Sequence, residues 1–336
     1  MINIAFLSTA HVHTKGFLEV IAQATDGRTA YAIWDDIPDR GRRYATSFKS
    51  KFVADLDVLL RDPNVDGFVI AAENTRHLPL LKRVVPVGKP VFCDKPLVTT
   101  TSEVREVAAL LKRHAGTKVL CGYFQPFGGQ MRAVAKLVSD SAFGRITRVR
   151  FRNAHHAAYG HRFDNPDLRW FHDPELSVGG AMMDMGTHAV HLLRTLFGPV
   201  TEVWANIGNE AGIYPEVDDF GIAHLKFASG ILGTAEAAWT QTGGIGGLEI
   251  VGSEKALWNN GKEYVTGSPN QEPVTLPPMP ARPTRIDRLV ATVVGQVTAD
   301  ELRDDLAAAI DAVKIMEAAY ESSETGRWVK VGGTYR

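Results

Sequence analysis

The first third of the chain alternates short apolar runs with longer amphipathic stretches. Short apolar runs bounded by turn residues predict buried strands, and stretches with apolar residues three or four positions apart predict helices. The predicted strands are 2–7, 29–34, 51–53, 67–71, 90–93 and 118–121, and the predicted helices are 15–24, 38–47, 56–62, 76–85 and 102–114. Because such strands need cover on both faces, we expect residues 1–122 to form an α/β domain with a doubly wound parallel sheet.

The pattern changes after Gly122. One helix is predicted at 127–139 and a closing helix at 300–322, while the intervening strands alternate polar and apolar residues and are joined by short turns. These strands are 145–153, 201–207, 219–227, 231–240, 247–251 and 255–259. Such alternation is typical of antiparallel sheets with one covered face, so we expect residues 123–336 to form an α+β domain with a large, mainly antiparallel open sheet. The six prolines between 261 and 283 predict a loop.

Size and composition narrow the class of protein. A chain of 336 residues exceeds what one core usually supports, which favours two domains. Its 37 basic and 38 acidic residues argue against a nucleic-acid partner, and no apolar run is long enough for a membrane span. Only Cys93 and Cys121 occur, which indicates neither disulfides nor a cysteine zinc site. The N-terminus lacks a signal-peptide pattern, so we expect a cytoplasmic protein that acts on a small molecule.

The turn after the first predicted strand is the expected place for a dinucleotide, because ligands of doubly wound sheets lie beyond the carboxyl ends of the strands. This turn contains no glycine before Gly16. Its residues are Ser8, Thr9, Ala10, His11, Val12 and His13. The small side chains still permit close approach to a pyrophosphate, and the following helix supplies N–H donors. The two histidines face the cofactor or a substrate anion, or only cap the turn; we expect no metal.

Asp35 ends the second predicted strand and is followed by Asp36. A carboxylate at this place accepts hydrogen bonds from the adenosine ribose and repels a 2′-phosphate. The pair therefore predicts NAD rather than NADP as the cofactor, unless Asp35 is only a solvated turn residue.

Two segments carry a family resemblance: Cys93-Asp94-Lys95-Pro96, and a stretch from Gly179-Gly180 to Asp184 and His188. With Ala72-Glu73-Asn74, His77 and the closing segment 323–329, they make the chain resemble the Gfo/Idh/MocA oxidoreductases over nearly its whole length. The resemblance implies a Rossmann domain followed by a sheet domain. It also implies that Lys95, Asp184 and His188 line the nicotinamide pocket, and that further cofactor contacts come from Ala72, Glu73, Asn74, His77, Asp94 and Lys95.

The chain departs from the family pattern at several positions. The glycine-rich turn is replaced, and the usual Glu-Lys-Pro is Asp94-Lys95-Pro96. Phe124 and Pro126 stand where polar residues are common. The Trp-Arg pair before the active helix reads Trp170-Phe171, and His191 replaces an acidic residue. These changes imply an unusual substrate pocket.

Asp184 and His188 are four positions apart on a predicted helix and therefore share one face. We expect the carboxylate to orient the imidazole so that His188 acts as a base, while Lys95 binds the reacting oxygen or exchanges the proton itself. Gly179 and Gly180 would let this helix approach the cofactor. The expected substrate residues are Lys95, Tyr123, Arg152, His155, His156, Trp170, His172, Asp184, His188 and His191.

These residues predict an NAD-dependent oxidoreductase that oxidises a secondary hydroxyl, or reduces the ketone, of a sugar, sugar acid or cyclitol. One alternative is an NAD-recycling glycosidase or epimerase, and another is a non-catalytic NAD-binding sensor. We expect a homodimer or homotetramer formed through the second sheet, because strands such as 221–227 and 231–239 would otherwise leave a partly apolar face exposed.

Overall fold

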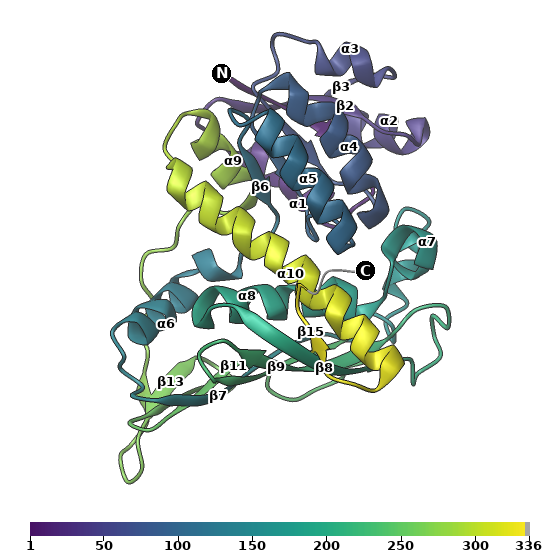
Figure 1. The fold of residues 1–336 in the computed structure, drawn as a ribbon. Helices are drawn as coiled ribbons and strands as arrows, with labels where there is room; N and C mark the ends of the chain where they lie inside the picture. The colour runs from purple at the N-terminus through teal and green to yellow at the C-terminus, as the bar shows by residue number, and fades with distance from the viewer. Residues whose placement is uncertain (333–336) are drawn as a thin grey trace.

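The computed structural model describes residues 1–332, and it contains two sheets with helices packed against them (Figure 1). One sheet lies in the upper half of Figure 1 and the other in the lower half, and the long helix α10, Ala299–Thr325, runs from one to the other. Within the described residues, no helix has the length and apolar character that a membrane span requires.

The first sheet has six parallel strands in the order β3-β2-β1-β4-β5-β6, so the predicted doubly wound α/β domain is confirmed. The strands are β1 Ile2–Leu7, β2 Arg28–Trp34, β3 Lys51–Phe52, β4 Gly67–Ile70, β5 Val91–Cys93 and β6 Val119–Cys121. The helices between them are α1 Thr14–Gln23, α2 Pro38–Ser47, α3 Leu56–Leu60, α4 His77–Val84 and α5 Thr101–Arg113. Because the strand order reverses between β1 and β4, a crevice is expected at the carboxyl ends of these strands.

The second sheet has nine strands in the order β14-β13-β12-β11-β7-β10-β9-β8-β15, and β7 with β10 is its one parallel pair among the described residues. The predicted mainly antiparallel sheet is therefore confirmed. Its strands are β7 Ile146–Ala154, β8 Val200–Gly208, β9 Phe220–Phe227, β10 Leu232–Ala238, β11 Gly247–Gly252, β12 Ala256–Asn259, β13 Tyr264–Gly267, β14 Val274–Thr275 and β15 Val329–Lys330. The accompanying helices are α6 Gly129–Ser139, α7 Pro174–Ser177 and α8 Thr187–Phe197.

The face of the second sheet away from α8 and α10 carries a row of charged pairs. Arg150 contacts Glu236 at 3.4 Å and Glu249 at 2.7 Å, and Arg152 contacts Glu236 at 2.6 Å. The same face also carries the apolar side chain of Leu232 on β10, which is 56% exposed. This face is thus more polar than the partly apolar face predicted from the sequence. Its charges lie on neighbouring strands and are paired with one another.

Two features of the last third of the chain were missed. The proline-rich segment 261–283, predicted as a loop, contains the short strands β13 and β14. The next helix, α9 Arg285–Val293, returns to the first sheet and packs against β4, β5 and α1. Its Leu289 is fully buried, and its Cδ1 atom lies 3.4 Å from where a Cβ would be on Gly67 of β4. Residues from the second half of the sequence therefore complete the core of the first domain.

The helix α10 connects the two domains through small and apolar side chains. It begins with a capping box in which Thr298 and Glu301 each bond the other's backbone N–H. Its buried face includes Ala308, Ala309 and Ala312, which allow close packing, and it contacts α5 and β6 of the first domain as well as α8 and β8 of the second. One hydrophobic core therefore runs continuously from the first sheet to the second.

Leu289→Ala should destabilise the protein by about 2–5 kcal/mol, because it leaves a cavity between α9 and the first sheet. The matched control is Val294→Ala, just after the same helix, where the side chain is 50% exposed and the expected change is below about 0.5 kcal/mol. Chemical denaturation of both variants measures the difference. Equal stability of the two variants would contradict the packing of α9 on this sheet.

Candidate active site

Asp218 fixes the start of the helical segment that carries Asp184 and His188. Its carboxylate accepts hydrogen bonds from the Gly180 N–H at 2.7 Å, the Met182 N–H at 2.6 Å and the Tyr320 hydroxyl at 2.8 Å. A Cβ on Gly180 would lie 1.9 Å from the Asp218 carbonyl oxygen, so a glycine is needed there. The helix start that we expected to approach the cofactor is thus capped by the Asp218 carboxylate.

Lys95 and Asp184 form an ion pair across the two domains. Lys95 lies just beyond the carboxyl end of β5, and its Nζ donates to Asp184 Oδ1 at 2.5 Å and to the Asp184 carbonyl at 2.9 Å. The other carboxylate oxygen accepts from Trp239 Nε1 at 2.9 Å. Burial alone would raise the pKa of Asp184, but the Lys95 ammonium and the Trp239 hydrogen bond hold it below its usual value. Asp184 is therefore a permanent carboxylate.

The expected hydrogen bond between Asp184 and His188 is absent from the described structure, because Lys95 and Trp239 occupy both oxygens of Asp184. A single π-helical turn, Met182–Gly186, also separates Asp184 from the regular helix α8 that contains His188. Asp184 and His188 line the same cavity, but they do not contact each other.

His188 is 5% exposed and its Nδ1 has no hydrogen-bond partner. The rings of Tyr123 and Phe124 contact the imidazole, with centroids at 5.7 and 5.5 Å. Burial, together with the nearby positive charge of Lys95, holds the pKa of His188 well below its ordinary value of 6.5. The imidazole is therefore neutral at physiological pH and has a free lone pair.

A cavity of about 190 Å³ opens beside these three residues. Expected site residues on its wall are Val12, His13, Lys95, His155, Asp184 and His188. Four further polar residues line it that were not predicted from the sequence: Gln125, Asn153, Arg162 and Arg285. Phe124, Phe163, Phe171 and Met185 supply the apolar part of the wall. The cavity thus combines a proton-transfer group with hydrogen-bonding side chains, as a hydroxylated ligand requires.

Three expected substrate residues belong instead to the packing beside the cavity. Tyr123 is buried, donates or accepts a 2.6 Å hydrogen bond with Thr187 Oγ1, and stacks on His191 with centroids 3.9 Å apart. Burial lowers the pKa of His191 to about 3, so it stays neutral. Trp170 donates to the Ala10 carbonyl at 3.0 Å. These three side chains therefore pack behind the residues that form the cavity wall.

Three other expected substrate residues also do not line this cavity. Arg152 pairs with Glu236 on the open face of the second sheet. His156 is exposed, and His172 stacks on Tyr214 with ring centroids 4.6 Å apart. Their side chains are directed away because each lies on another face of its strand or loop.

The glycine-free turn after β1 is tied to Asp94. Oδ2 of this fully buried carboxylate lies 2.9 Å from His11 Nδ1 and 3.0 Å from His13 Nδ1. The three atoms lie within 4.8 Å of one another, and the shared carboxylate accounts for this closeness. Burial, opposed by the Asp94 charge, lowers the pKa of His11 to about 4. The two histidines thus hold the turn against the end of β5.

Asp35, expected to face the cofactor ribose, is 2% exposed and fully hydrogen-bonded within the protein. It accepts from the Thr9 N–H at 2.8 Å, the Thr9 hydroxyl at 2.5 Å and the Ile37 N–H at 2.9 Å. Arg40 adds an ion pair at 2.8 Å, and the same guanidinium reaches Glu73 at 3.1 Å and Ser8 Oγ at 3.2 Å. Asp35 therefore fixes the turn. Its charge is neutralised by Arg40, a residue that was not predicted to take part.

Asp36 is the carboxylate that reaches open space at this strand end. It lines a cavity of about 550 Å³, together with Trp34 and Arg76, and it is paired with Arg76. Burial and the charge of Glu73 raise the pKa of Asp36, against the opposing effect of Arg76. This cavity lies beside the carboxyl end of β2, where the adenosine part of a dinucleotide binds in such domains.

The remaining expected cofactor residues are buried and bonded within the chain. The imidazole of His77 lies between two backbone carbonyl oxygens, that of Ala72 at 3.2 Å from Nε2 and that of Pro96 at 2.7 Å from Nδ1. Asn74 Nδ2 donates to the Ser177 carbonyl at 2.8 Å, which joins the strand end to α7. These residues shape the crevice through its backbone.

Unpartnered polar atoms collect around the same crevice. Buried side-chain atoms without a hydrogen-bond partner include His11 Nε2, Thr14 Oγ1, His188 Nδ1 and Arg285 Nε. The N-terminus of α1 has no side-chain cap and no acidic residue in its first turn. Since buried polar groups normally have partners, and uncapped helix N-termini attract phosphate, these residues fit a dinucleotide bound in the crevice.

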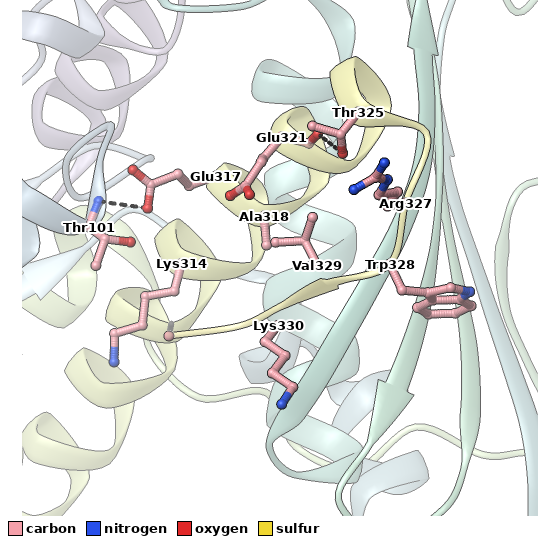
Figure 2. A pocket seen from close by; sticks show the side chains of 11 residues that line it. Thr101, Lys314, Glu317, Ala318, Glu321, Thr325, Arg327, Trp328, Val329 and Lys330 are labelled. Atoms are coloured by element: carbon pink, nitrogen blue, oxygen red, sulfur yellow. Dashed lines mark hydrogen bonds between the residues drawn. The ribbon is translucent and has the colours of Figure 1, made fainter. Parts of the chain in front are cut away.

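A larger cavity, of about 680 Å³, lies between α10, α5 and β15 (Figure 2). Figure 2 shows Glu317 of α10 accepting from the Thr101 N–H, at 3.2 Å, and Lys314 on the same helix. None of the expected site residues lines it among the described residues. It therefore lacks the arrangement for proton transfer found beside Lys95.

Comparison with known proteins gives two family matches. Residues 3–123 match the oxidoreductase family with an NAD-binding Rossmann fold, and residues 131–258 match the GFO/IDH/MocA C-terminal domain. The first domain is therefore an NAD-binding Rossmann domain. The two matches together cover most of the chain.

Individual relatives are more distant. The chain is 26% identical to 1,5-anhydro-D-fructose reductase from Ensifer adhaerens, over 69% of this chain and 67% of that protein. It is 27% identical to inositol 2-dehydrogenase from Acidothermus cellulolyticus, over 61% of this chain and 57% of that protein, so the match spans little more than half of this relative. Levoglucosan dehydrogenase, solved with NADH and L-sorbose, has the same fold with a TM-score of 0.80 at 20% identity, covering 98% of this chain and 99% of that one. From the two domain matches, the chain belongs to the GFO/IDH/MocA oxidoreductase family.

Proposed function

We propose that this protein is an NAD-dependent dehydrogenase that oxidises a secondary hydroxyl of a sugar, sugar acid or cyclitol, or reduces the corresponding ketone. The observation that carries the proposal is the Lys95–Asp184 ion pair beside His188 on the wall of the 190 Å³ cavity. The named relatives act on a sugar derivative and on inositol, which supports this substrate class.

Lys95 positions the reacting oxygen in this mechanism. An ammonium group has three N–H donors, and two of them are directed to the carboxylate and carbonyl of Asp184. The third is free to donate to a substrate hydroxyl. The ionised Asp184 holds Lys95 Nζ in one orientation, and the positive charge of Lys95 stabilises the alkoxide that develops as the hydroxyl loses its proton.

His188 takes that proton. Its imidazole is neutral and buried, and its Nδ1 has no hydrogen-bond partner, so it can accept a proton and later release it to solvent. The neighbouring Lys95 charge favours the neutral form of the base before the reaction. Bound NAD supplies the hydride acceptor for the carbon atom of the substrate.

Asp36 and Arg76 together determine the cofactor preference. Asp36 presents a carboxylate to the 550 Å³ cavity, while Arg76 is neutralised by Asp36 and lies 3.5 Å from Glu73. A 2′-phosphate would meet negative charge there, which favours NAD. Asp35 contributes indirectly by holding the turn.

The open face of the second sheet is the proposed surface for a homodimer or homotetramer. Its paired charges on β7, β10 and β11, with exposed Leu232, can match a second copy of the same surface about a two-fold axis. We place the assembled enzyme in the cytoplasm.

The function is tested by the stoichiometry of NADH formation with sugars, sugar acids and inositols. The wild-type protein should release one NADH per ketone formed. Lys95→Met should lower kcat by about two orders of magnitude or more while NAD still binds, because the reacting oxygen loses its donor. Product formed without net NADH would instead indicate an NAD-recycling glycosidase or epimerase, and NAD binding without any turnover a sensor.

His188→Asn should reduce kcat by about two orders of magnitude with little effect on NAD binding, because the base is lost. His156→Asn, which changes an exposed histidine outside the cavity, is the matched control. Since the pKa of His188 is lowered, its protonation should reduce wild-type activity only below pH 6.5. Full activity of the His188 variant would remove it from the mechanism.

Asp36→Asn should raise the ratio of NADP to NAD efficiency about tenfold or more, because it removes the negative charge facing the 2′-position and frees Arg76. Asp57→Asn, another acidic residue on the same cavity wall, is the control and should leave the ratio nearly unchanged. Steady-state kinetics with both cofactors measure the ratio. An unchanged ratio in the Asp36 variant would exclude this role.

A further inference from the structure

Arg285 presents a guanidinium group to the active-site cavity without an acidic partner. It is the first residue of α9, and its Nε is buried and makes no hydrogen bond. Within residues 1–332, its guanidinium forms no ion pair with a carboxylate, and among acidic residues only Asp94 acts on it through its charge. The guanidinium lies instead over the ring of Phe124, 4.0 Å from the centroid, with the Phe17 ring at 5.8 Å. Two aromatic rings thus hold the cation without neutralising it.

Among the described residues, the two arginines that are buried are neutralised. Arg40 is 2% exposed and pairs with Asp35, Asp36 and Glu73, and Arg288, only three residues after Arg285, is 6% exposed and pairs with Asp305. Charged groups removed from water normally need such partners. Arg285 is only partly buried, and its side chain differs from both in facing a cavity without an acidic partner.

The backbone of Arg285 is also unusual. Its φ angle is +50°, in the left-handed region that L side chains rarely adopt. The preceding Thr284 provides no side-chain cap for α9. A residue held in an unfavourable backbone conformation by its surroundings is a frequent feature of ligand sites. Here the conformation accompanies the placement of the guanidinium against Phe124.

The charges around the cavity do not balance. Lys95 is matched by Asp184, which among the described residues is the only acidic one on the cavity wall, whereas Arg162 and Arg285 add two positive charges. Asp94 acts on Arg285 at longer range, but its oxygens are already engaged by His11, His13 and the Lys95 N–H. The cavity therefore has an excess of positive charge that a ligand can neutralise.

We propose that Arg285 binds a carboxylate group of the substrate, so that the oxidised molecule is a sugar acid or a related polyhydroxy acid. This inference rests on the proposed dehydrogenase function. A planar guanidinium matches a carboxylate with two parallel hydrogen bonds. Arg285 lies on the same cavity wall as Lys95 and His188, so a carboxylate held there would be on the molecule whose hydroxyl is oxidised.

The test uses matched pairs of neutral and acidic substrates with the full-length protein and NAD. D-Gluconate is compared with D-glucitol, D-glucuronate with D-glucose, and myo-inositol serves as a further neutral probe. The wild type should prefer the acids by about tenfold or more in kcat/KM. Arg285→Gln should reduce this preference by about 10- to 100-fold, the usual worth of a charged hydrogen-bonded pair, and Arg285→Lys should keep part of it.

Arg282→Gln is the matched control, because Arg282 is 49% exposed, pairs with Glu301 and lies outside the cavity. Thermal unfolding and NAD titration by protein fluorescence are measured for every variant. If Arg285→Gln weakens NAD binding and lowers activity equally on acids and neutral polyols, its ligand is the cofactor diphosphate and the proposal is wrong. Equal use of acids and neutral polyols by the wild type would also overturn it, with the dehydrogenase function intact.

If no compound gives NADH, the dehydrogenase function fails for this substrate panel, and calorimetric binding of gluconate and glucuronate to the NAD-loaded protein decides about Arg285 separately. Binding that is lost in Arg285→Gln and kept in Arg282→Gln supports the carboxylate site. Absence of binding to the wild type overturns it.

Discussion

The buried ion pair between Lys95 and Asp184 determines how the two domains meet at the reaction site. Lys95 follows β5 of the first domain and Asp184 belongs to the second domain, and their charged atoms are 2.5 Å apart. Removing one partner of such a pair costs about 3–5 kcal/mol, since the other charge is left buried. Trp239 and the backbone around Asp218 hold Asp184 from the opposite side. The ion pair therefore links the two domains at the crevice and fixes the orientation of the amine that is proposed to face the substrate.

The fold was largely predictable because the strands bury their side chains almost completely. The four residues of β4 are all buried, and a continuous apolar run of this kind has few alternatives in a chain of alternating helices. The helix α9 was missed for the opposite reason. It follows a run of prolines, and it contains only nine residues, so its apolar face is visible only when the first sheet is known to need cover. Which helix covers a given face of a sheet depends on the tertiary structure, and the local sequence of α9 does not reveal it.

Many residues near the site could be proposed from their residue types, but the direction in which their side chains point was harder to predict. In β7, Phe151 is buried, and the period of two residues puts Arg150 and Arg152 on the open face. The same alternation assigns Asn153 to the covered side, where its amide donates to the Met185 carbonyl at 2.9 Å and lines the cavity. Arg152 was therefore a poor candidate, and Asn153 a better one, on strand alternation alone. By contrast, Asp184 could not be assigned to Lys95 and Trp239, because these partners lie 89 and 55 positions away.

The departures from the family pattern act together. With histidines in place of glycines, the turn after β1 needs a buried acceptor, and Asp94 provides it. Aspartate is one methylene shorter than the glutamate usual at that position, and its oxygens are engaged by the turn and by the Lys95 N–H. Asp94 therefore acts on Arg285 only through its charge, without an ion pair. The apolar Phe124, which replaces a residue that is commonly polar, stacks on Arg285 without neutralising its charge. Three changes that look independent along the sequence thus have one electrostatic result, an uncompensated cation on the wall of the active site.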